Sequence, residues 1–561
     1  MFKEIKYMSY LTKESVDRLK NDPAFEELRT ELFRIAEEKL AATPLYASFT
    51  ELNLFAETGD RKTFERVLND YNGRLHVFPF AYLLSEDEKY LAPLADAIWS
   101  YCDFESWSLP AHANMDDSTA RREHIDLNAA SVGMLLVQIL SLFEDKLPRR
   151  LCLRVHHELR ARIIDPFKKY RDKWYYKTEN NWASVIAAGV FCVYLYEAQP
   201  LEITSQLPVL MEMIENYLCG FDDEGCCKEG FGYWNYGFSH FCIFAELLRT
   251  YTDGTEDLFR RDKVRAIAHF QENASLDEVH TIPFSDTAPT FSPLPHLTHF
   301  LKREYPDVVV PNMKLRYSTG NLRFVSWLSA DIKSEGLVQK SHIFHENQWF
   351  IYKSEKYNMA CKAGTNGEFH NHNDVGSFAI SKNGEVTLTD PGAAPYTRQY
   401  FSKDRYTFVE SSSLGHSVPI VNGICQNADN NPANRHAEIF AENAREYAFS
   451  MEQNYADPTL LSLRRHFVCE DEALVLTDTY EFSASPQALV ERFVCLRAPV
   501  FEQAGRVEIG ESTLLYDADM WELTLGGAPR SCSKSGNVEI FFIDFSPKQS
   551  HEQMTFTARF V

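Results

Sequence analysis

The chain has 561 residues, which is too long for one ordinary hydrophobic core and predicts two or three domains. Hydrophobic residues make up 45% and charged residues 24%, as in soluble globular proteins. The formal net charge of −23 excludes broad binding to nucleic acids, because neutralising phosphates needs a basic surface. The same charge opposes a polyanionic ligand unless a local basic or polar cleft receives it.

Residues 1–22 contain no apolar run of signal-peptide length, and no stretch of about 18 apolar residues occurs in the chain. We therefore expect no membrane partner and a cytoplasmic protein, or a periplasmic or secreted one if a leader has been removed. The twelve cysteines form no C-x-x-C pair, and most lie in apolar sequence. This pattern indicates small buried thiols in a reducing compartment.

Residues 1 to about 310 have a helical pattern. Apolar residues recur at helical spacing in eight segments with short polar breaks between them: 15–42, 60–84, 85–104, 127–147, 148–170, 182–198, 207–221 and 237–253. Helical hairpins in series build a bundle, a solenoid or a closed double ring of helices. No repeat of fixed period occurs, which favours the closed ring.

The pattern changes after about residue 335. Apolar and polar residues now alternate in strand-like runs: 341–364, 376–390, 437–453, 464–482, 488–510, 513–527 and 537–547. Asn-Gly, Glu-Asp-Glu and Gly-Gly turns separate some of these runs. We predict a helical domain over residues 1–335 and an antiparallel β-sandwich over residues 336–561.

The most unusual segment is Gly364–Gly392, which contains five consecutive polar residues, His370 to Asp374. In a strand, His370, His372 and Asp374 would project to one face, and Asp390 would return to it one strand later. His416 follows downstream. Nitrogen and oxygen donors of this kind suit Zn²⁺ best, whereas the plainer interpretation is a polar strand end.

A second polar and aromatic segment, Asp222–His240, opens a predicted helix. Glu229, Tyr233 and Tyr236 are spaced to share one helical face. Clustered Tyr and Trp side chains stack on sugar rings, and phenols transfer protons. An aromatic core stripe is the competing interpretation.

A third segment, Glu179–Trp182, stands at the entry of an apolar helix, where Asn180 is also a typical N-cap residue. His112 and His124 lie near it in an aromatic and polar stretch and are weaker candidates. No serine-hydrolase, P-loop, H-E-x-x-H or C-x-x-C motif occurs in the chain.

Together these motifs resemble the heparinase II/III family of polysaccharide lyases. They are Asn180-Asn181-Trp182, then EGFGYWNYG (Glu229–Gly237), then HNHNDVGSF (His370–Phe378) with LTDPG (Leu388–Gly392). The resemblance spans about residues 100–430 and is most specific around His370. It implies an N-terminal (α/α) toroid of helical hairpins followed by a C-terminal antiparallel β-sandwich.

The resemblance further implies a lyase that cleaves uronic-acid-containing glycans by β-elimination and leaves an unsaturated uronate at the new non-reducing end. Glycosaminoglycans such as heparan sulfate, hyaluronan or chondroitin sulfate are the expected substrates, and alginate or another uronate polysaccharide is an alternative. The difficult step is removal of the weakly acidic C5 proton, so the enzyme has to neutralise the uronate carboxylate.

Individual residues inherit expected roles from the resemblance. Asn181 resembles the carboxylate neutraliser and His370 the catalytic histidine. Tyr236 or Tyr233 resembles the tyrosine that protonates the leaving oxygen, and we favour Tyr236. Some family members carry a histidine where this chain has Trp182. A base from that position is therefore absent, and the catalytic roles are expected to fall to Tyr236 and His370.

The remaining candidates fall into two groups. Asn180, Trp182, Glu229, Trp234, His112 and His124 are expected to bind the sugar. His372, Asp390 and His416 resemble the ligands of a divalent metal, expected to be Zn²⁺, that organises the site without itself being the catalyst. The oligomeric state stays open, a homodimer included.

Two other classes of protein compete with the lyase. A glycoside hydrolase would need two carboxylates about 5–9.5 Å apart, and Glu229 has no convincing partner in the sequence. A non-catalytic glycan-binding protein of the same fold is the other alternative.

Overall fold

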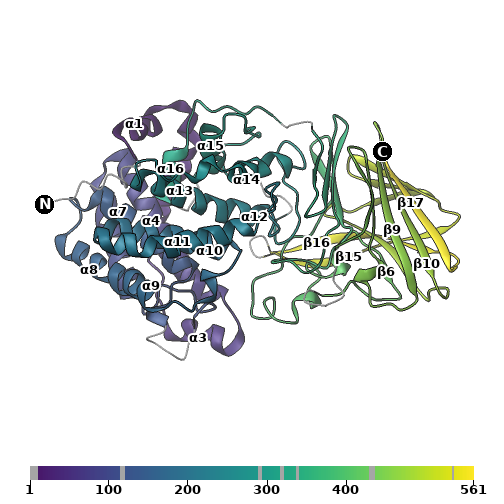
Figure 1. The fold of residues 1–561 in the computed structure, drawn as a ribbon, viewed down its shortest axis with the longest axis horizontal. Coiled ribbons are helices and arrows are strands. Elements are labelled where there is room, and N and C mark those ends of the chain that lie inside the picture. The colour runs from purple at the N-terminus through teal and green to yellow at the C-terminus, as the bar shows by residue number, and fades with distance from the viewer. Residues whose placement is uncertain are drawn as a thin grey trace. The chain divides into compact units, whose positions relative to one another are not determined.

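The structure is a computed structural model that describes residues 11–113, 121–288, 293–315, 317, 321–336, 340–428, 436–532 and 536–561. The chain folds into two compact units. Unit 1 comprises Met1–Gly220, Asn235–Arg265 and Leu294–Lys333, and unit 2 comprises Phe221–Trp234, Ala266–Pro293 and Ser334–Val561. Figure 1 draws the helices in purple to teal and most of the strands in green to yellow.

The predicted division between residues 335 and 336 lies close to the last change of unit, after Lys333. Two earlier segments, Phe221–Trp234 and Ala266–Pro293, nevertheless fold with the strands of unit 2. The prediction of two continuous domains placed both segments in the helical domain, which is wrong. They bring Glu229, Tyr233 and Asp286 into unit 2.

The helical pattern gives helices throughout the N-terminal part of the chain. They are α1 (Lys13–Asn21), α2 (Glu26–Ala41), α3 (Phe49–Thr58), α4 (Lys62–Ser85), α5 (Leu91–Asp103), α7 (Leu127–Phe143), α8 (Arg149–Leu159), α9 (Asp165–Lys169), α10 (Asn181–Glu197), α11 (Pro200–Cys219), α12 (Phe231–Tyr233), α13 (Ser239–Tyr251), α14 (Asp262–Asn273), α15 (Pro295–Glu304) and α16 (Leu322–Trp327). No helix in the described ranges is long and apolar enough to cross a membrane.

Helix α10 is the most completely buried long helix of unit 1. Its residues from Ala183 to Leu195 are all buried, and it packs against α7, α11 and α13. A helix that is apolar on every side belongs in the interior of a protein. Gly189 allows α7 to approach closely, since a Cβ atom added there would lie 2.5 Å from the Ala130 carbonyl oxygen.

Unit 2 contains the strands, which form three antiparallel sheets. The strands are β1 (His342–Phe344), β2 (Trp349–Lys353), β3 (Tyr357–Lys362), β4 (Phe378–Lys382), β5 (Glu385–Leu388), β6 (Ile420–Val421), β7 (Ile439–Asn443), β8 (Glu446–Ser450), β9 (Leu460–Cys469), β10 (Leu474–Phe482), β11 (Leu489–Cys495), β12 (Val500–Gln503), β13 (Arg506–Ile509), β14 (Ser512–Tyr516), β15 (Trp521–Cys532), β16 (Gly536–Pro547) and β17 (Gln553–Phe560).

The sheets run β1-β2-β3-β4-β5, β12-β13-β14-β17-β10-β9-β8-β7 and β15-β16-β11-β6. Apolar side chains of all three meet in one core, for example Met359, Phe467 and Phe493. The predicted Asn-Gly turn is present between β4 and β5, where Asn383 and Gly384 have φ values of 52° and 75°. Two consecutive residues with positive φ are the mark of a tight hairpin turn.

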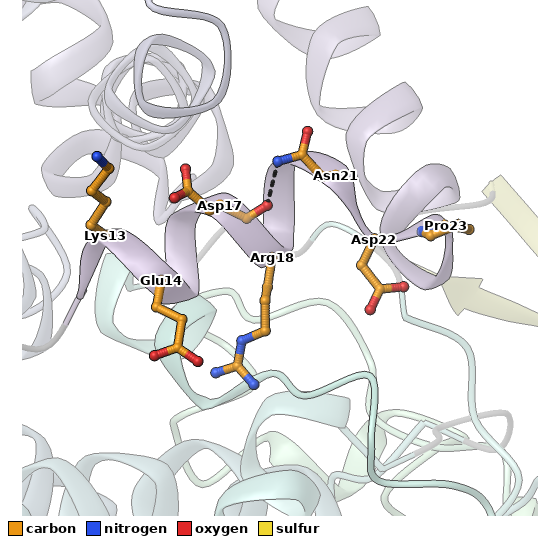
Figure 2. A pocket seen from close by; sticks show the side chains of 7 residues that line it. All are labelled: Lys13, Glu14, Asp17, Arg18, Asn21, Asp22 and Pro23. Atoms are coloured by element: carbon orange, nitrogen blue, oxygen red, sulfur yellow. Dashed lines mark hydrogen bonds between the residues drawn. The ribbon is translucent and has the colours of Figure 1, made fainter.

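The surface beside α1 has an open hollow lined by residues of that helix and of the short turn after it. Figure 2 shows this lining, with the Asn21 side chain donating to the carbonyl oxygen of Asp17. Charged side chains of both signs line it, among them Lys13, Glu14 and Arg18. The described residues that line the hollow form no set of groups for catalysis.

The close contact at Gly189 gives a prediction about stability. Gly189→Ala should destabilise the protein by up to about 2 kcal/mol, because overpacking of α10 against α7 costs about 1–3 kcal/mol and the gain in helix propensity offsets only about 1 kcal/mol of it. Gly73→Ala is the matched control, since a Cβ atom there meets only the flexible Lys39 side chain at 3.5 Å. Urea unfolding followed by circular dichroism measures both. Equal stability of the two variants would contradict this account of the packing.

Candidate active site and metal cluster

The polar run His370–Asp374 lies in the connection between β3 and β4 and forms no strand. The predicted strand with three side chains on one face is therefore wrong. His370 has a φ of 54°, a left-handed conformation that is uncommon outside glycine. The chain bends there, so that His370 and His372 enter different clusters.

The first cluster consists of His372, Asp374, Asp390 and His416, all four of them buried. One ligand atom from each lies within 4.8 Å of the others. Each of the four residues has one buried side-chain atom, Nδ1 of the histidines and Oδ2 of the aspartates, without a hydrogen-bond partner among the described residues. His416 Nδ1 lies 3.1 Å from Asp390 Oδ2.

The far side of each imidazole in the cluster is held in place. His372 Nε2 lies 3.0 Å from Asp286 Oδ1, and His416 Nε2 lies 3.0 Å from the Glu410 carbonyl oxygen. Both acceptors require a proton on Nε2, which leaves the Nδ1 lone pairs directed into the cluster.

The two carboxylates of the cluster are held in the same way. Lys362 Nζ donates to Asp374 Oδ1 at 2.8 Å, and the Gly392 amide donates to Asp390 Oδ1 at 2.7 Å. One oxygen of each carboxylate is thus occupied, and the other faces the cluster. Buried polar atoms without partners are costly, so four that converge are best explained by a ligand that binds them all.

The donor set fits a divalent metal. Two imidazole nitrogens and two carboxylate oxygens suit tetrahedral Zn²⁺. Burial lowers the pKa of His372, but the Asp390 and Asp286 carboxylates together raise it to about 9, so a metal that binds Nδ1 would have to displace a proton from it. The predicted ligands His372, Asp390 and His416 do come together, and Asp374 joins them as a fourth. Whether zinc occupies the cluster stays a prediction.

His370 belongs to a second cluster beside the first. Its Nδ1 lies 2.8 Å from Asp286 Oδ2, and its ring stacks on Tyr233 with centroids 4.0 Å apart. Its Nε2 lies 3.6 Å from Glu229 Oε2. The histidine is therefore oriented by a buried carboxylate on one side, while its other nitrogen faces Glu229.

Tyr233 hydrogen-bonds through its hydroxyl to the Tyr396 hydroxyl, 2.6 Å away. Tyr396 in turn donates to Asp286 at 2.9 Å. Burial, and then the negative charge of Asp286, raise the pKa of Tyr233 well above its usual value. Tyr233 is therefore a neutral phenol that can give a proton but does not readily take one.

The expectation that Glu229, Tyr233 and Tyr236 share one helical face is wrong. The helix begins at Phe231, and Gly230 before it has a φ of 91°. From Trp234 to Phe238 the chain follows a π-helix, which changes the angular spacing of the side chains. Short π-helical segments inside α-helices are frequent at functional sites.

Trp234 was expected to bind sugar, but the structure favours the aromatic-core interpretation. Its side chain is fully buried and its indole nitrogen donates to the Ile267 carbonyl oxygen at 2.9 Å. It packs against Phe231 and Phe270. A buried ring in these contacts presents no face to a ligand.

In unit 1, Asn180 caps α10 by accepting from the Trp182 amide at 3.1 Å, as its sequence position suggested. Asn181 is 2% exposed and packs closely against Gly237, where an added Cβ atom would lie 3.1 Å from its own Cβ. Tyr236 contacts His240, and burial raises its pKa above the usual value. The roles proposed for Asn181 and Tyr236 stay predictions.

His112 and Trp182 do come together in unit 1, with ring centroids 4.7 Å apart. Asp126, which is fully buried, lies 2.8 Å from His112 Nδ1. Trp174, which is 53% exposed, adds a second indole ring, whose centroid lies 4.8 Å from that of the Trp182 ring. His124 lies 6.3 Å from the Tyr175 ring at the margin of this aromatic group, and burial lowers its pKa.

Comparison with known families shows what the C-terminal part resembles. Residues 338–520 match the family described as heparinase II/III-like, C-terminal. The family resemblance predicted from the sequence is confirmed. The heparinase-like region holds His370 and the four residues of the candidate metal cluster, His372, Asp374, Asp390 and His416. A comparison with curated proteins finds no match.

Solved structures extend the likeness over almost the whole chain. Heparinase III has a TM-score of 0.62 at 13% identity, with 98% of this chain and 94% of that chain covered. A mutant heparan sulfate lyase from Pedobacter heparinus has a TM-score of 0.58 at 13% identity, with 98% and 93% covered. Chondroitin AC lyase from Streptomyces coelicolor, in complex with chondroitin sulphate, has a TM-score of 0.59 at 10% identity, with 99% and 82% covered. These confirm the predicted fold class, a helical toroid followed by an antiparallel β-sandwich.

Sequence reasoning missed several residues around the heparinase-like motif. Asp286, Tyr396, Tyr400 and Arg405 lie outside the quoted motifs, and Asp374 was not among the proposed metal ligands. The segment from Tyr396 to Tyr406, rich in Tyr and Arg, was a usable signal. Nothing in the sequence around Asp286 marks it, because its importance comes from long-range contacts.

The metal cluster gives a prediction for metal binding. The protein should bind one equivalent of Zn²⁺ after dialysis, measured by elemental analysis. Loss of a residue that only supports a metal ligand weakens metal binding by about 10- to 100-fold. Asp374→Asn should weaken zinc binding by more than this, because it removes a ligand itself. The control is Asp222→Asn, which alters a buried carboxylate of unit 2 outside the cluster.

Wild-type zinc affinity in Asp374→Asn would reduce the ligand set to His372, Asp390 and His416. A wild-type protein that binds no stoichiometric metal would contradict the assignment of the cluster.

Proposed function

We propose that the protein is a polysaccharide lyase that cleaves glycosaminoglycans by β-elimination at a uronic acid. The observation that carries this proposal is the stacking of Tyr233 on His370, at 4.0 Å, in a fold shared with solved heparin and chondroitin lyases. A histidine and a tyrosine together supply the base and the acid that the reaction needs.

The hydrogen bonds assign the two roles. The Nδ1–H group of His370 donates a hydrogen bond to Asp286, so Nε2 keeps its lone pair. This lone pair takes the proton from C5 of the uronate. Tyr233, whose pKa burial raises, keeps its proton and gives it to the bridging oxygen as the bond to C4 breaks. Glu229, 3.6 Å from Nε2, stabilises the imidazolium that forms.

This assignment moves the preferred tyrosine from Tyr236 to Tyr233. A base role for tyrosine would need a lowered pKa, and the surroundings of Tyr233 do the opposite. The proposed neutralisation of the uronate carboxylate by Asn181 rests on the family resemblance alone.

An acidic substrate has to overcome the net charge of −23. The segment Ala394–Phe408 supports local binding, because Arg398 and Lys403 are exposed on it and Phe401 is 51% exposed. Interspersed cations and aromatic rings suit an acidic sugar, whose anionic groups pair with the cations while its ring stacks. Charges beyond about 8 Å are screened at physiological salt.

A metal in the cluster of His372, Asp374, Asp390 and His416 would fix the connection that carries His370. We assign it no part in proton transfer, since His370 and Tyr233 account for both proton steps. A bound Zn²⁺ would supply charge compensation for the two buried carboxylates.

The glycoside hydrolase alternative loses support. Glu229 and Asp286 both flank His370, but the Asp286 side chain has no exposed surface and accepts hydrogen bonds from several donors. A carboxylate in that state cannot act on a sugar or on a water beside it. The pair therefore lacks the two accessible carboxylates of a hydrolase.

The proposed activity is tested by incubating the protein with heparan sulfate, hyaluronan, chondroitin sulfate and alginate. We expect ultraviolet absorbance from an unsaturated uronate with at least one glycosaminoglycan. Absorbance with alginate alone would identify the alternative lyase. New reducing ends without absorbance would establish hydrolysis, and no product from any glycan would favour a binding protein.

The choice of tyrosine is tested by two matched variants. Tyr233→Phe should lower kcat by about 10²- to 10⁴-fold, the range for loss of a general acid, and leave KM little changed. Tyr236→Phe should retain activity near the wild-type level. The reverse pattern in steady-state kinetics would restore Tyr236 as the catalytic residue.

A further inference from the structure

Asp286 is the acceptor on which both clusters converge. It lies in the segment Ala266–Pro293 of unit 2, and its side chain is fully buried. Five donors reach it: His370 Nδ1 at 2.8 Å and Tyr396 Oη at 2.9 Å on Oδ2, and His372 Nε2 at 3.0 Å, Tyr400 Oη at 2.5 Å and an Arg405 nitrogen at 3.0 Å on Oδ1.

The number of donors exceeds what folding alone requires. A buried carboxylate needs a cation and enough hydrogen bonds to replace water, and Arg405 with the two tyrosines already provide these. The additional pairing with His370 and His372 links one carboxylate to the base of the proposed reaction and to a residue of the metal cluster. The two links use different oxygens, Oδ2 for His370 and Oδ1 for His372.

The pairing fixes where the proton of His370 sits. An ionised carboxylate only accepts, so a nitrogen 2.8 Å from it has to carry a proton. With the proton on Nδ1, neutral His370 has its lone pair on Nε2. Tautomer and ring orientation are then set before any substrate binds, as base catalysis requires.

We propose that Asp286 is a positioning residue that holds His370 in the Nδ1-protonated tautomer, with Nε2 available as the base. The inference rests on the proposed lyase function for its kinetic consequence only. The tautomer itself is a property of the folded protein and is measured without substrate.

Asp286→Asn tests the proposal because the two oxygens have different partners. The amide oxygen should keep the Oδ1 place, since the Arg405 cation needs an acceptor there. The amide NH₂ group then takes the Oδ2 place and faces His370 Nδ1, which has to become an acceptor. The His370 proton moves to Nε2, and the base is lost.

The kinetic result expected for Asp286→Asn is a fall in kcat of about 10²- to 10⁴-fold, as for other losses of a base. KM and the zinc content should stay near the wild-type values, because the contacts of Oδ1 are retained. The matched control is Asp277→Asn, a buried carboxylate of unit 2 that likewise accepts from a histidine and a hydroxyl, His280 and Ser381. It should leave kcat unchanged.

A merely structural role would give a different pattern. KM would rise or zinc would be lost together with kcat, or Asp277→Asn would have the same effect. Either outcome overturns the positioning role.

The tautomer is read directly from long-range ¹H–¹⁵N spectra of protein labelled with ¹⁵N-histidine, with the His370 signals assigned by their loss in His370→Gln. The proposal predicts a proton on Nδ1 in the wild type and on Nε2 in Asp286→Asn. A wild-type protein in which the neutral His370 ring carries its proton on Nε2 overturns the proposal. Because this measurement uses the wild type, it tests the proposal even if Asp286→Asn fails to fold. If the wild type shows the Nδ1 proton but cleaves no glycan, the lyase function fails and the role of Asp286 in setting the tautomer stands.

Discussion

The hydrogen-bond capacity of one buried carboxylate governs the arrangement of the candidate site. Asp286 accepts from two histidines, two tyrosines and an arginine, and its side chain has no exposed surface. Removing one partner from a buried ion pair typically costs about 3–5 kcal/mol, because the other charge is left uncompensated. The donors are thus bound to each other through Asp286, and His370 cannot reorient without breaking this network.

The connection between β3 and β4 depends on such contacts because it lacks the hydrogen bonds of a sheet. Asn366 accepts from the Asp374 amide at 3.2 Å, and Gln426 accepts from the Val375 amide at 2.9 Å. Arg465, which is fully buried and paired with Asp478, donates to the carbonyl oxygens of Gly376 and Ser417, both at 2.7 Å. The sheet core of unit 2 therefore anchors the chain beside Asp374 and beside His416. Hydrogen bonds from buried side chains of the core thus hold this irregular backbone and its polar side chains in place, as a catalytic site requires.

Much of the fold followed from sequence patterns, because helical spacing and strand alternation report directly on burial. Helix α10 and the Asn383-Gly384 hairpin are examples in which local chemistry and the fold agree. Strand β17 was missed although Met554, Phe556, Ala558 and Phe560 alternate as buried residues. The segments Phe221–Trp234 and Ala266–Pro293 could not be assigned to unit 2 from sequence, since nothing local distinguishes them from helical connections.

The candidate site was predicted in part. His372, Asp390 and His416 were identified from residue type and family resemblance, and the structure does bring them together. The strand geometry assumed for them was wrong because His370 adopts a left-handed conformation, which no pattern of polar residues reveals. Asp286 was out of reach for the same kind of reason: its role comes from partners 84 to 119 positions away in the chain.

The central claim is that His370 and Tyr233 act on the uronic acid from fixed positions. Diffraction from crystals of Tyr233→Phe, soaked with an oligosaccharide that the wild-type protein cleaves, tests it most directly. The account predicts a uronate whose C5 faces His370 Nε2 and whose bridging oxygen faces the ring of residue 233. A uronate bound with no contact to His370 would contradict it.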